Sequence, residues 1–179
     1  MHARFSFRTS IALGLLAIVL AGGADAAERR GLPAPEAGVT DLRFGDWFKL
    51  PVGRAGLEPS PQLRALDGQR VRVLGYVVGE EEPTPGVFML TANPVTLAEV
   101  ADGPADDLPP ATLYVHPAPA DASKVVAHRP GLLVLNGVLE LGNREEPNGR
   151  TSFARLRLDQ PLPAAEPAAV AAQATHHAH

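Results

Sequence analysis

Prolines and glycines are the feature that most restricts how this chain can fold. The sequence holds 18 prolines and 17 glycines in 179 residues. Both residues interrupt helices, proline because it lacks an N–H donor and clashes with the preceding turn, glycine because its backbone is so free. The prolines gather at 33–35, 51–61, 83–85, 104–119 and 161–167. Long helices are therefore not expected, and the apolar stretches between these clusters must form short elements.

Five stretches of the chain have the pattern of β-strands. Residues 70–78 begin with strict alternation of polar and apolar side chains and then become fully apolar, which is typical of a half-buried strand that enters a core. Gly75 and Gly137 lie in the middle of the two longest stretches, where a glycine usually marks a bulge or a sharp bend. The other expected strands are residues 87–91, 112–116, 132–141 and 152–158.

The order of these elements indicates a small barrel. A short helical turn is expected at 61–66, and another at 94–100, where Pro94 suits a first turn. A parallel α/β sheet needs crossover helices that this order lacks, whereas bent strands with central glycines allow five strands to close. We therefore predict a mainly β fold, a five-stranded OB-like antiparallel barrel with one short helix over residues 41–160. A small open sandwich is the alternative.

The first 26 residues have the three parts of a secretory signal peptide. Arg4 and Arg8 make a positive region, residues 11–20 are continuously apolar, and residues 24–26 (Ala-Asp-Ala) offer small side chains to a signal peptidase. The apolar run is shorter than the roughly 20 residues that a membrane span requires. We expect cleavage after Ala26, a periplasmic location and no membrane span in the mature protein, with an uncleaved anchor as the alternative.

The mature chain is acidic and has no cysteine. Removal of 26 of the 179 residues leaves 153, which suits one domain with a modest core. Cleavage leaves 14 of 16 basic and 19 of 20 acidic side chains, a formal charge of −5 that attracts neither nucleic acid nor anionic lipid. The absence of cysteine excludes disulfides, a lipoprotein anchor and thiol chemistry. Residues 27–40 are expected to form a flexible leader, and residues 161–179 a disordered tail rich in Ala, Pro and His.

Several short sequences occur in a familiar order. They are Leu-Asp-Gly-Gln at 66–69, Val-Arg-Val-Leu-Gly-Tyr-Val-Val at 71–78, Pro-Gly-Val-Phe-Met-Leu at 85–90, Pro-Val at 94–95 and Ala-Asp-Asp-Leu-Pro-Pro-Ala at 105–111. This order, over residues 41–158, resembles an uncharacterised family of exported bacterial proteins with an OB-like barrel, a domain-of-unknown-function family. The resemblance implies a periplasmic, non-catalytic accessory or binding module of the cell envelope that serves a transport system and contacts an envelope protein. Some relatives have cysteines near the second strand, and any function that depends on them does not transfer to this chain.

The C-terminal tail holds a candidate metal site. His176, His177 and His179 form a His-His-x-His sequence. Imidazoles bind late divalent metals, so these three residues predict a site for copper, nickel or zinc, and a periplasmic metal-binding or metal-delivery protein is the alternative function. Biased histidine tracts are only compositional signals, however, and a solvated tail with incidental affinity is the simpler interpretation.

Two weaker metal sites are also considered. His116 and His128 need a third ligand such as Asp121, and two loop-end histidines that face solvent are the simpler interpretation. The three aspartates within residues 102–107 have oxygen ligands that suit calcium, but their spacing differs from an EF-hand, and roles in turns explain them more simply.

Arginines on two of the expected strands predict a surface for a ligand or a partner. OB barrels bind oligonucleotides and oligosaccharides on such faces, and the acidic charge of this chain argues against nucleic acid. Pairing of the arginines with the acidic runs at 80–82 and 145–146 is the alternative. The predicted surface consists of Arg70, Arg72, Tyr76, Arg155 and Arg157.

Aromatic residues near the start of the domain predict a flap. Phe44, Trp47 and Phe48 are expected to pack on the barrel, with a partner-binding segment as the alternative.

The sequence contains no G-x-S-x-G, no H-E-x-x-H and no phosphate-binding loop, so we expect a protein that is not an enzyme. A hydrolase without a known motif is a third possibility, and the oligomeric state stays open.

Overall fold

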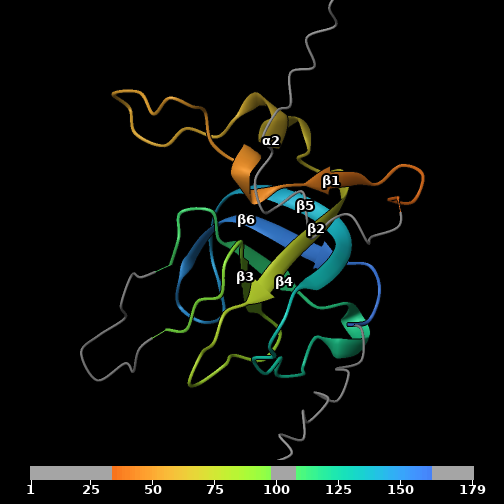
Figure 1. Cartoon of the computed structure of the whole chain (residues 1–179). Coiled ribbons are helices and arrows are strands. Elements are labelled where there is room, and N and C mark those ends of the chain that lie inside the picture. The colour runs from red at the N-terminus through yellow and green to blue at the C-terminus, as the bar shows by residue number, and fades with distance from the viewer. Residues whose placement is uncertain (1–33, 98–107, 163–179) are drawn as a thin grey trace, which may run out of the picture. The chain divides into compact units, whose positions relative to one another are not determined.

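The computed structural model describes residues 34–97 and 108–162 (Figure 1). These residues form one α-helix, α2 (Pro61–Ala65), and two 3-10 helices, η2 (Phe44–Asp46) and η4 (Pro119–Asp121). No helix in these two ranges is long and apolar enough to cross a membrane. The described strands make a single sheet of β1 (Thr40–Leu42), β2 (Arg70–Val77), β3 (Phe88–Thr91), β4 (Leu113–His116), β5 (Leu133–Glu145) and β6 (Thr151–Leu158).

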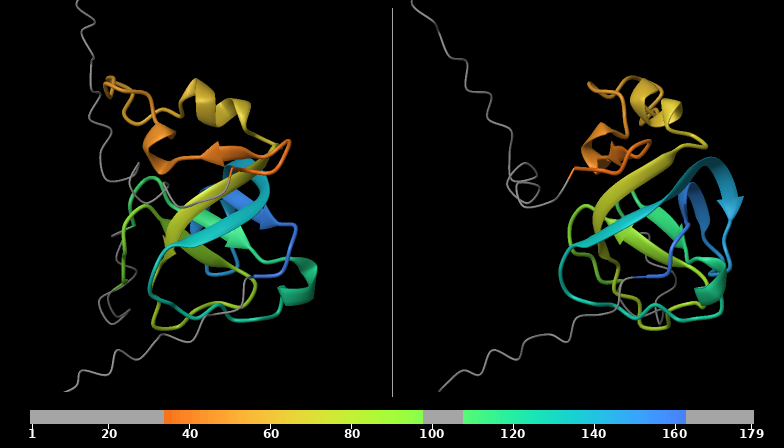
Figure 2. Two further views of the ribbon diagram at one scale, coloured as in Figure 1. Left: turned by 45° about the vertical axis from the view of Figure 1, so that its right-hand side comes forward. Right: turned by 90° about the vertical axis from the view of Figure 1, so that its right-hand side faces the viewer.

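The sheet closes because β2 pairs with both β3 and β5. The strands follow one another as β2-β3-β4-β6-β5, and β5 returns to β2 through an antiparallel ladder from Arg70 opposite Val138 to Gly75 opposite Leu133. Within the barrel, β4 and β6 are parallel and the other pairs are antiparallel. This is the Greek-key order of an OB barrel. The predicted mainly β, five-stranded OB-like barrel is thus confirmed (Figure 2).

The apolar faces of the barrel strands point inward and form the main core. Alternate residues of β2, β4 and β6 are fully or almost fully buried, as period-2 patterning requires. The core also takes in Trp47 and Leu63 from outside the barrel, each 1% exposed. The barrel core therefore continues into the segment that precedes β2.

That preceding segment forms a layer on one side of the barrel, seen in orange and gold in Figures 1 and 2. β1 pairs with β2 in parallel, from Thr40 opposite Val71 onward. The Trp47 ring stacks on Phe44 with 5.4 Å between ring centroids and meets the edge of Phe48 at 6.5 Å. The predicted aromatic flap is confirmed. The three-residue strand β1 was not predicted, because so short a run shows no alternation.

Ser60 fixes the short helix α2 to this layer. Its Oγ accepts a hydrogen bond from the Leu63 N–H at 3.0 Å, and its hydroxyl donates to the Asp46 carbonyl oxygen at 2.5 Å. Ser at the N-cap with Pro61 at the first helical position is a strong start signal for a helix. The helical turn predicted at 61–66 is therefore confirmed.

The helical turn predicted at 94–100 is wrong for the part that the structure describes. Residues 94–97 are not helical, and Thr96 forms a parallel bridge with Gly79. Gly79 donates to the Val95 carbonyl oxygen, and Leu97 donates to the Gly79 carbonyl oxygen, both at 2.8 Å. These long-range bonds satisfy the backbone that a helical turn would otherwise satisfy locally. Residues 98–100 lie outside the described ranges.

Gly75 and Gly137 allow close backbone approach and do not form bulges. The β2–β5 ladder has no shift in register, with Gly137 opposite Val71 inside it and Gly75 opposite Leu133 at its end. A Cβ atom on Gly137 would lie 2.3 Å from the Arg157 carbonyl oxygen, and one on Gly75 would lie 3.1 Å from that of Thr91. The bare backbone at these positions is what lets neighbouring strands of the small barrel approach each other.

The register shift lies further along β5, which is longer than predicted. It occurs between Leu141 and Arg144, where Gly142 has a φ of +114°, a conformation that favours glycine. Beyond the shift, the hairpin continues to Glu145 opposite Thr151. The strand thus extends to 13 residues (Figure 2). Its last three residues, 143–145, are exposed on the outside of the barrel.

Replacing Gly137 with alanine is expected to lower the free energy of unfolding by about 1–3 kcal/mol, because the new methyl group overlaps the Arg157 carbonyl. Urea denaturation measures this change. Gly45→Ala is the matched control, since no atom lies within 4 Å of a Cβ there, and its effect should stay within about 0.5 kcal/mol. Equal losses in the two variants would contradict this role of Gly137.

Candidate functional site

The barrel face that most often binds ligands in OB folds is covered in this protein. That face belongs to the second and third barrel strands, here β3 and β4. Met89 and Tyr114 point outward from these strands opposite each other and are 0% and 5% exposed. Val95, Leu97 and Leu108, from the connection between the two strands, pack against them in a second apolar cluster. In the described part of the chain, apolar side chains therefore cover this face.

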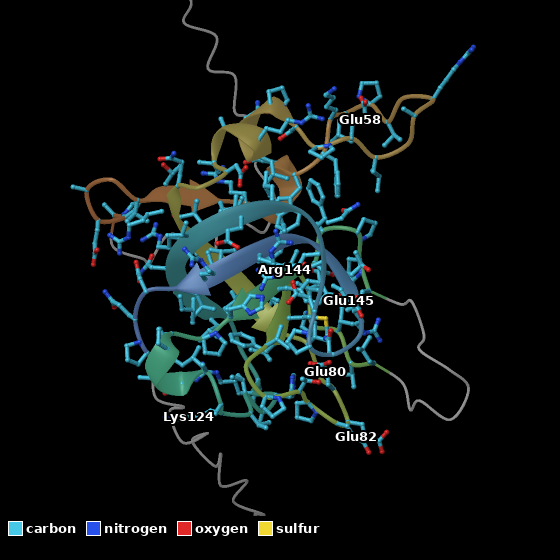
Figure 3. The ribbon with its side chains drawn as sticks, turned by 180° about the vertical axis from the view of Figure 1, so that it is seen from behind. Glu58, Glu80, Glu82, Lys124, Arg144 and Glu145 are labelled. Atoms are coloured by element: carbon cyan, nitrogen blue, oxygen red, sulfur yellow. The ribbon has the colours of Figure 1, made fainter. Side chains whose placement is uncertain are left out.

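The two loops that flank this face also approach each other. Glu80 lies in the β2–β3 loop, and Arg150 lies in the β5–β6 turn. Burial raises the pKa of the Glu80 carboxyl, and the positive charge of Arg150 opposes that rise in part. Figure 3 shows Glu80 on the same side of the molecule as Glu145 of the hairpin.

An open, charged face lies on the neighbouring strands β2, β5 and β6. Arg70 is opposite Val138 in one ladder, and Val138 is opposite Arg157 in the next, so the three side chains form a single row. The row points outward, because the flanking Val71 and Leu139 are fully buried. The side chains of Arg70 and Arg157 are 41% and 60% exposed. We call this row, with the two carboxylates that pair with it, the charged face.

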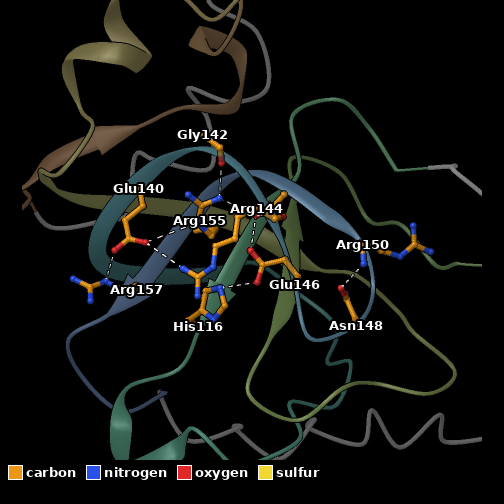
Figure 4. Close-up of polar contacts among 10 residues, drawn as sticks. His116, Glu140, Gly142, Arg144, Glu146, Asn148, Arg150, Arg155 and Arg157 are labelled. Carbon is orange, nitrogen blue, oxygen red and sulfur yellow. Dashed lines mark hydrogen bonds and ion pairs between the residues drawn. The ribbon is translucent and has the colours of Figure 1, made fainter.

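Each arginine of the charged face has one carboxylate partner. Arg70 Nη2 lies 2.6 Å from Asp159 Oδ2, and its Nε donates to the same oxygen at 2.8 Å. Arg157 Nε lies 2.7 Å from Glu140 Oε1 (Figure 4). A guanidinium has five N–H donors, and these pairs use one or two of them. The charged face therefore keeps donors for an anionic or hydroxyl-bearing ligand.

A hollow of about 300 Å³ adjoins the charged face where β5 and β6 separate. The ladder between these strands begins at Gly137 opposite Leu158, so the first residues of β5 have no β6 residue beside them. Asn136 and Gln160 contribute amide groups to the lining, next to apolar atoms of Val134 and Pro161. This lining is more polar than apolar, which suits a small polar ligand.

A chain of buried polar contacts fixes the β5–β6 hairpin beside this face (Figure 4). Arg155 Nη1 donates to the Gly142 carbonyl oxygen at 2.6 Å and to Ser152 Oγ at 2.9 Å. The Ser152 hydroxyl donates to Glu146 Oε1 at 2.5 Å, and Glu146 Oε2 lies 3.0 Å from His116 Nε2. The Glu146 side chain is 0% exposed and that of Arg155 is 6% exposed. We call this chain the hairpin network.

The last contact of the hairpin network, between His116 and Glu146, is not a charged pair at neutral pH. The two atoms are within ion-pair distance, but neither has a partner that meets hydrogen-bond geometry. Burial lowers the pKa of the His116 imidazole more than the Glu146 carboxylate raises it, and Arg144 and Arg155 lower it further. His116 is therefore neutral at pH 7, so that a neutral ring lies against a buried carboxylate.

The predicted arginine surface is divided between an exposed and a buried part. Arg70 and Arg157 lie on the charged face, whereas Arg72 and Arg155 are only 9% and 5% exposed. Arg72 forms an ion pair at 2.7 Å with the aspartate of β1. Tyr76 is half-buried near the end of β2. Only the exposed pair is therefore accessible to a ligand on the charged face.

The structure does not bring the side chains of the predicted internal metal ligands together. His128 Nδ1 lies 3.0 Å from the Val77 carbonyl oxygen, His116 faces Glu146, and Asp121 pairs with Lys124 at 2.6 Å. Across residues 34–97 and 108–162, no group of three histidines or carboxylates is placed to hold a metal ion. The interpretation of His116 as solvent-facing is wrong, since its side chain is 20% exposed.

The remaining predicted metal ligands lie outside the described ranges. They are His176, His177 and His179 and the three aspartates within 102–107.

Sequence reasoning missed most of the hairpin network. On the neighbouring charged face, Glu140 gave a usable signal, because it is the one charge in the apolar run at 132–141. Ser152 gave no signal, and the acidic run at 145–146 was considered only as a partner of the arginines. The contact between Ser152 and Glu146 depends on the register shift before Arg144. A bulge of this kind is a local change in backbone conformation, which the alternation of polar and apolar residues in the sequence does not predict.

The strand order makes this chain an OB-like barrel protein. No family model matches the chain, and no curated protein matches it. One solved structure that is similar is a DUF3299 family protein from Pseudomonas aeruginosa PAO1. It has 17% sequence identity and a TM-score of 0.43, and the match covers 72% of this chain and 97% of that chain. That neighbour is named as a member of a domain-of-unknown-function family.

The buried imidazole predicts how stability depends on pH. The pKa of His116 is lowered by folding, so between pH 7.5 and 5.5 the unfolded chain takes up a proton before the folded chain does, and the free energy of unfolding falls. His116→Gln removes this uptake. Urea denaturation at several pH values should therefore show a larger loss on acidification for the wild type than for the variant. Parallel pH curves would contradict the lowered pKa.

Proposed function

We propose that this protein is an exported, periplasmic and non-catalytic binding module that works as an accessory of the cell envelope. The observation that carries the proposal is the row of Arg70, Val138 and Arg157 on an open face beside a hollow of about 300 Å³. The signal-like N-terminus supports export. The covered β3–β4 face supports placing the ligand on the charged face, because it leaves no room at the usual OB position.

The chemistry of the charged face favours a short acidic oligosaccharide. Arg70 and Arg157 suit carboxylates, for which the guanidinium fork is the best donor. Glu140, Asn136 and Gln160 supply acceptors and amides for sugar hydroxyls. The acidic charge of the chain argues against nucleic acid, which needs a broadly positive surface.

A titration with tri-galacturonate tests the proposal. We expect amide shift changes in NMR spectra at residues 134–138 and 157–160, and Arg157→Ala should weaken binding about tenfold because one charge-assisted contact is lost. Arg64→Ala is the matched control, since Arg64 is an exposed arginine on α2, remote in sequence from the charged face. Shift changes confined to other residues, or equal weakening by both variants, would overturn this assignment.

The His-His-x-His tail favours a second function, the binding or delivery of copper, nickel or zinc. Replacement of His176, His177 and His179 by alanine should abolish metal loading in equilibrium dialysis. The melting temperature of the wild type should not rise with metal, because three histidines within four consecutive residues can bind a metal ion in the unfolded chain as well. Metal that stays bound to the triple variant would exclude the tail as the site.

A further inference from the structure

An apolar arm projects from the layer that precedes the barrel. The arm consists of residues 49–58, between η2 and α2, and appears as the orange and gold loop that leaves the barrel in Figure 1. An antiparallel bridge between Phe48 and Pro59 holds its base, and a second bridge between Gly53 and Gly56 holds its tip. Lys49 and Glu58 pair across the base at 3.1 Å. Figure 3 shows Glu58 on this projecting part.

The arm concentrates the exposed apolar side chains of the described residues. Leu50 is 77% exposed, Val52 is 52% exposed and Leu57 is 45% exposed. Only Val125 and Leu132, among large apolar residues of the described ranges, are comparably exposed outside the arm. A single exposed leucine is ordinary, but three such side chains on one short projecting loop indicate an interaction surface.

A hollow of about 500 Å³ lies at the base of the arm. Its lining includes the half-buried ring of Phe48, the ring of Pro61 and the carboxylate residue Asp46. Leu50 lines the rim where the arm begins. We call this feature the basal hollow. The tip of the arm does not line the basal hollow, because the lining includes Lys49 and Leu50 at the start of the arm and none of residues 51–59.

The arm and the basal hollow carry complementary charges. Arg54 lies at the tip, between the bridged glycines, and is exposed. Asp46 is exposed at the basal hollow. Neither residue forms an ion pair with any other residue in the described part of the chain. Lys49 also lines the basal hollow, but it pairs with Glu58. The exposed Arg54 of one copy therefore matches the exposed Asp46 at the basal hollow of another copy in charge, while Phe48, Leu50 and Pro61 supply the apolar part of the lining.

We propose that two copies of this chain associate about a two-fold axis, with the arm of each copy in the basal hollow of the other. In this arrangement Val52 and Leu57 cover Phe48 and Pro61 of the second copy, and Arg54 pairs with its Asp46. A two-fold interface is self-complementary, so one arm and one hollow on the same surface provide both halves of the contact. A lipid surface is a poorer occupant, because the acidic chain has no general attraction for anionic lipid.

Sedimentation velocity over a concentration series tests the association. The protein should show a monomer–dimer equilibrium, and Val52→Asp should raise the dissociation constant at least about tenfold, because a charge replaces a buried apolar contact. Val125→Asp is the matched control, since Val125 is 50% exposed and lies outside the arm. A protein that is monomeric at every concentration, or a dimer that both variants weaken equally, would overturn the proposal.

Charge reversal gives a second test that a folding defect cannot imitate. In Asp46→Arg alone, and in Arg54→Asp alone, both contacts of the two-fold dimer bring like charges together, and each variant should be monomeric. A mixture of the two variants restores attraction at both contacts of a mixed dimer. One contact joins Arg54 to Asp46 as in the wild type, and the other joins the two substituted residues with their charges exchanged. The mixture should therefore form a heterodimer of the two chains, seen by mass-tagging one of them. Dimerisation of either single variant, or no association in the mixture, would overturn the Arg54–Asp46 contact.

Discussion

The pairing of β2 with β5 is the contact on which the rest of this structure depends. Six consecutive residue pairs join the strands, and without them the remaining ladders leave an open sheet. The opposite edge of β2 pairs with β1 along its first half and with β3 at its last residues. Both edges of β2 therefore form backbone hydrogen bonds with other strands. The same ladder places Arg70 beside Val138 and so builds the charged face.

The outward faces of this small closed barrel differ in polarity. The outward face of β3 and β4 is filled by apolar side chains from the connection between these strands, whereas the outward face of β5 and β6 is charged. Next to the charged face, the hairpin network buries Glu146 and Arg155 with Ser152 between them. Buried charges are costly unless they are paired, and such networks are better understood as fixing one conformation than as adding stability. Here the fixed element is the β5–β6 hairpin.

The charged face and the arm use different residues and different chemistry. The charged face offers guanidinium donors, carboxylates and amides beside a small hollow, which suits a polar ligand. The arm offers leucine and valine side chains with one cation at the tip, which suits a protein surface. A binding module that pairs through its arms would present two charged faces at once, and two linked sites hold a multivalent ligand more tightly than either site alone.

The sequence by itself determined the elements and their faces. Alternation in 70–78 and 152–158 and the clusters of proline specify short strands, and Ser60-Pro61 specifies the start of α2, because these are local backbone and patterning effects. Only the tertiary structure decided which outward residues share a face. Arg72 is buried and Arg70 exposed on the same strand because β1 covers one and not the other. Glu146 meets His116 because of a register shift at Gly142, and residues 94–97 are extended because they pair with Gly79. Each of these outcomes depends on contacts between segments far apart in the chain, which local pattern does not encode.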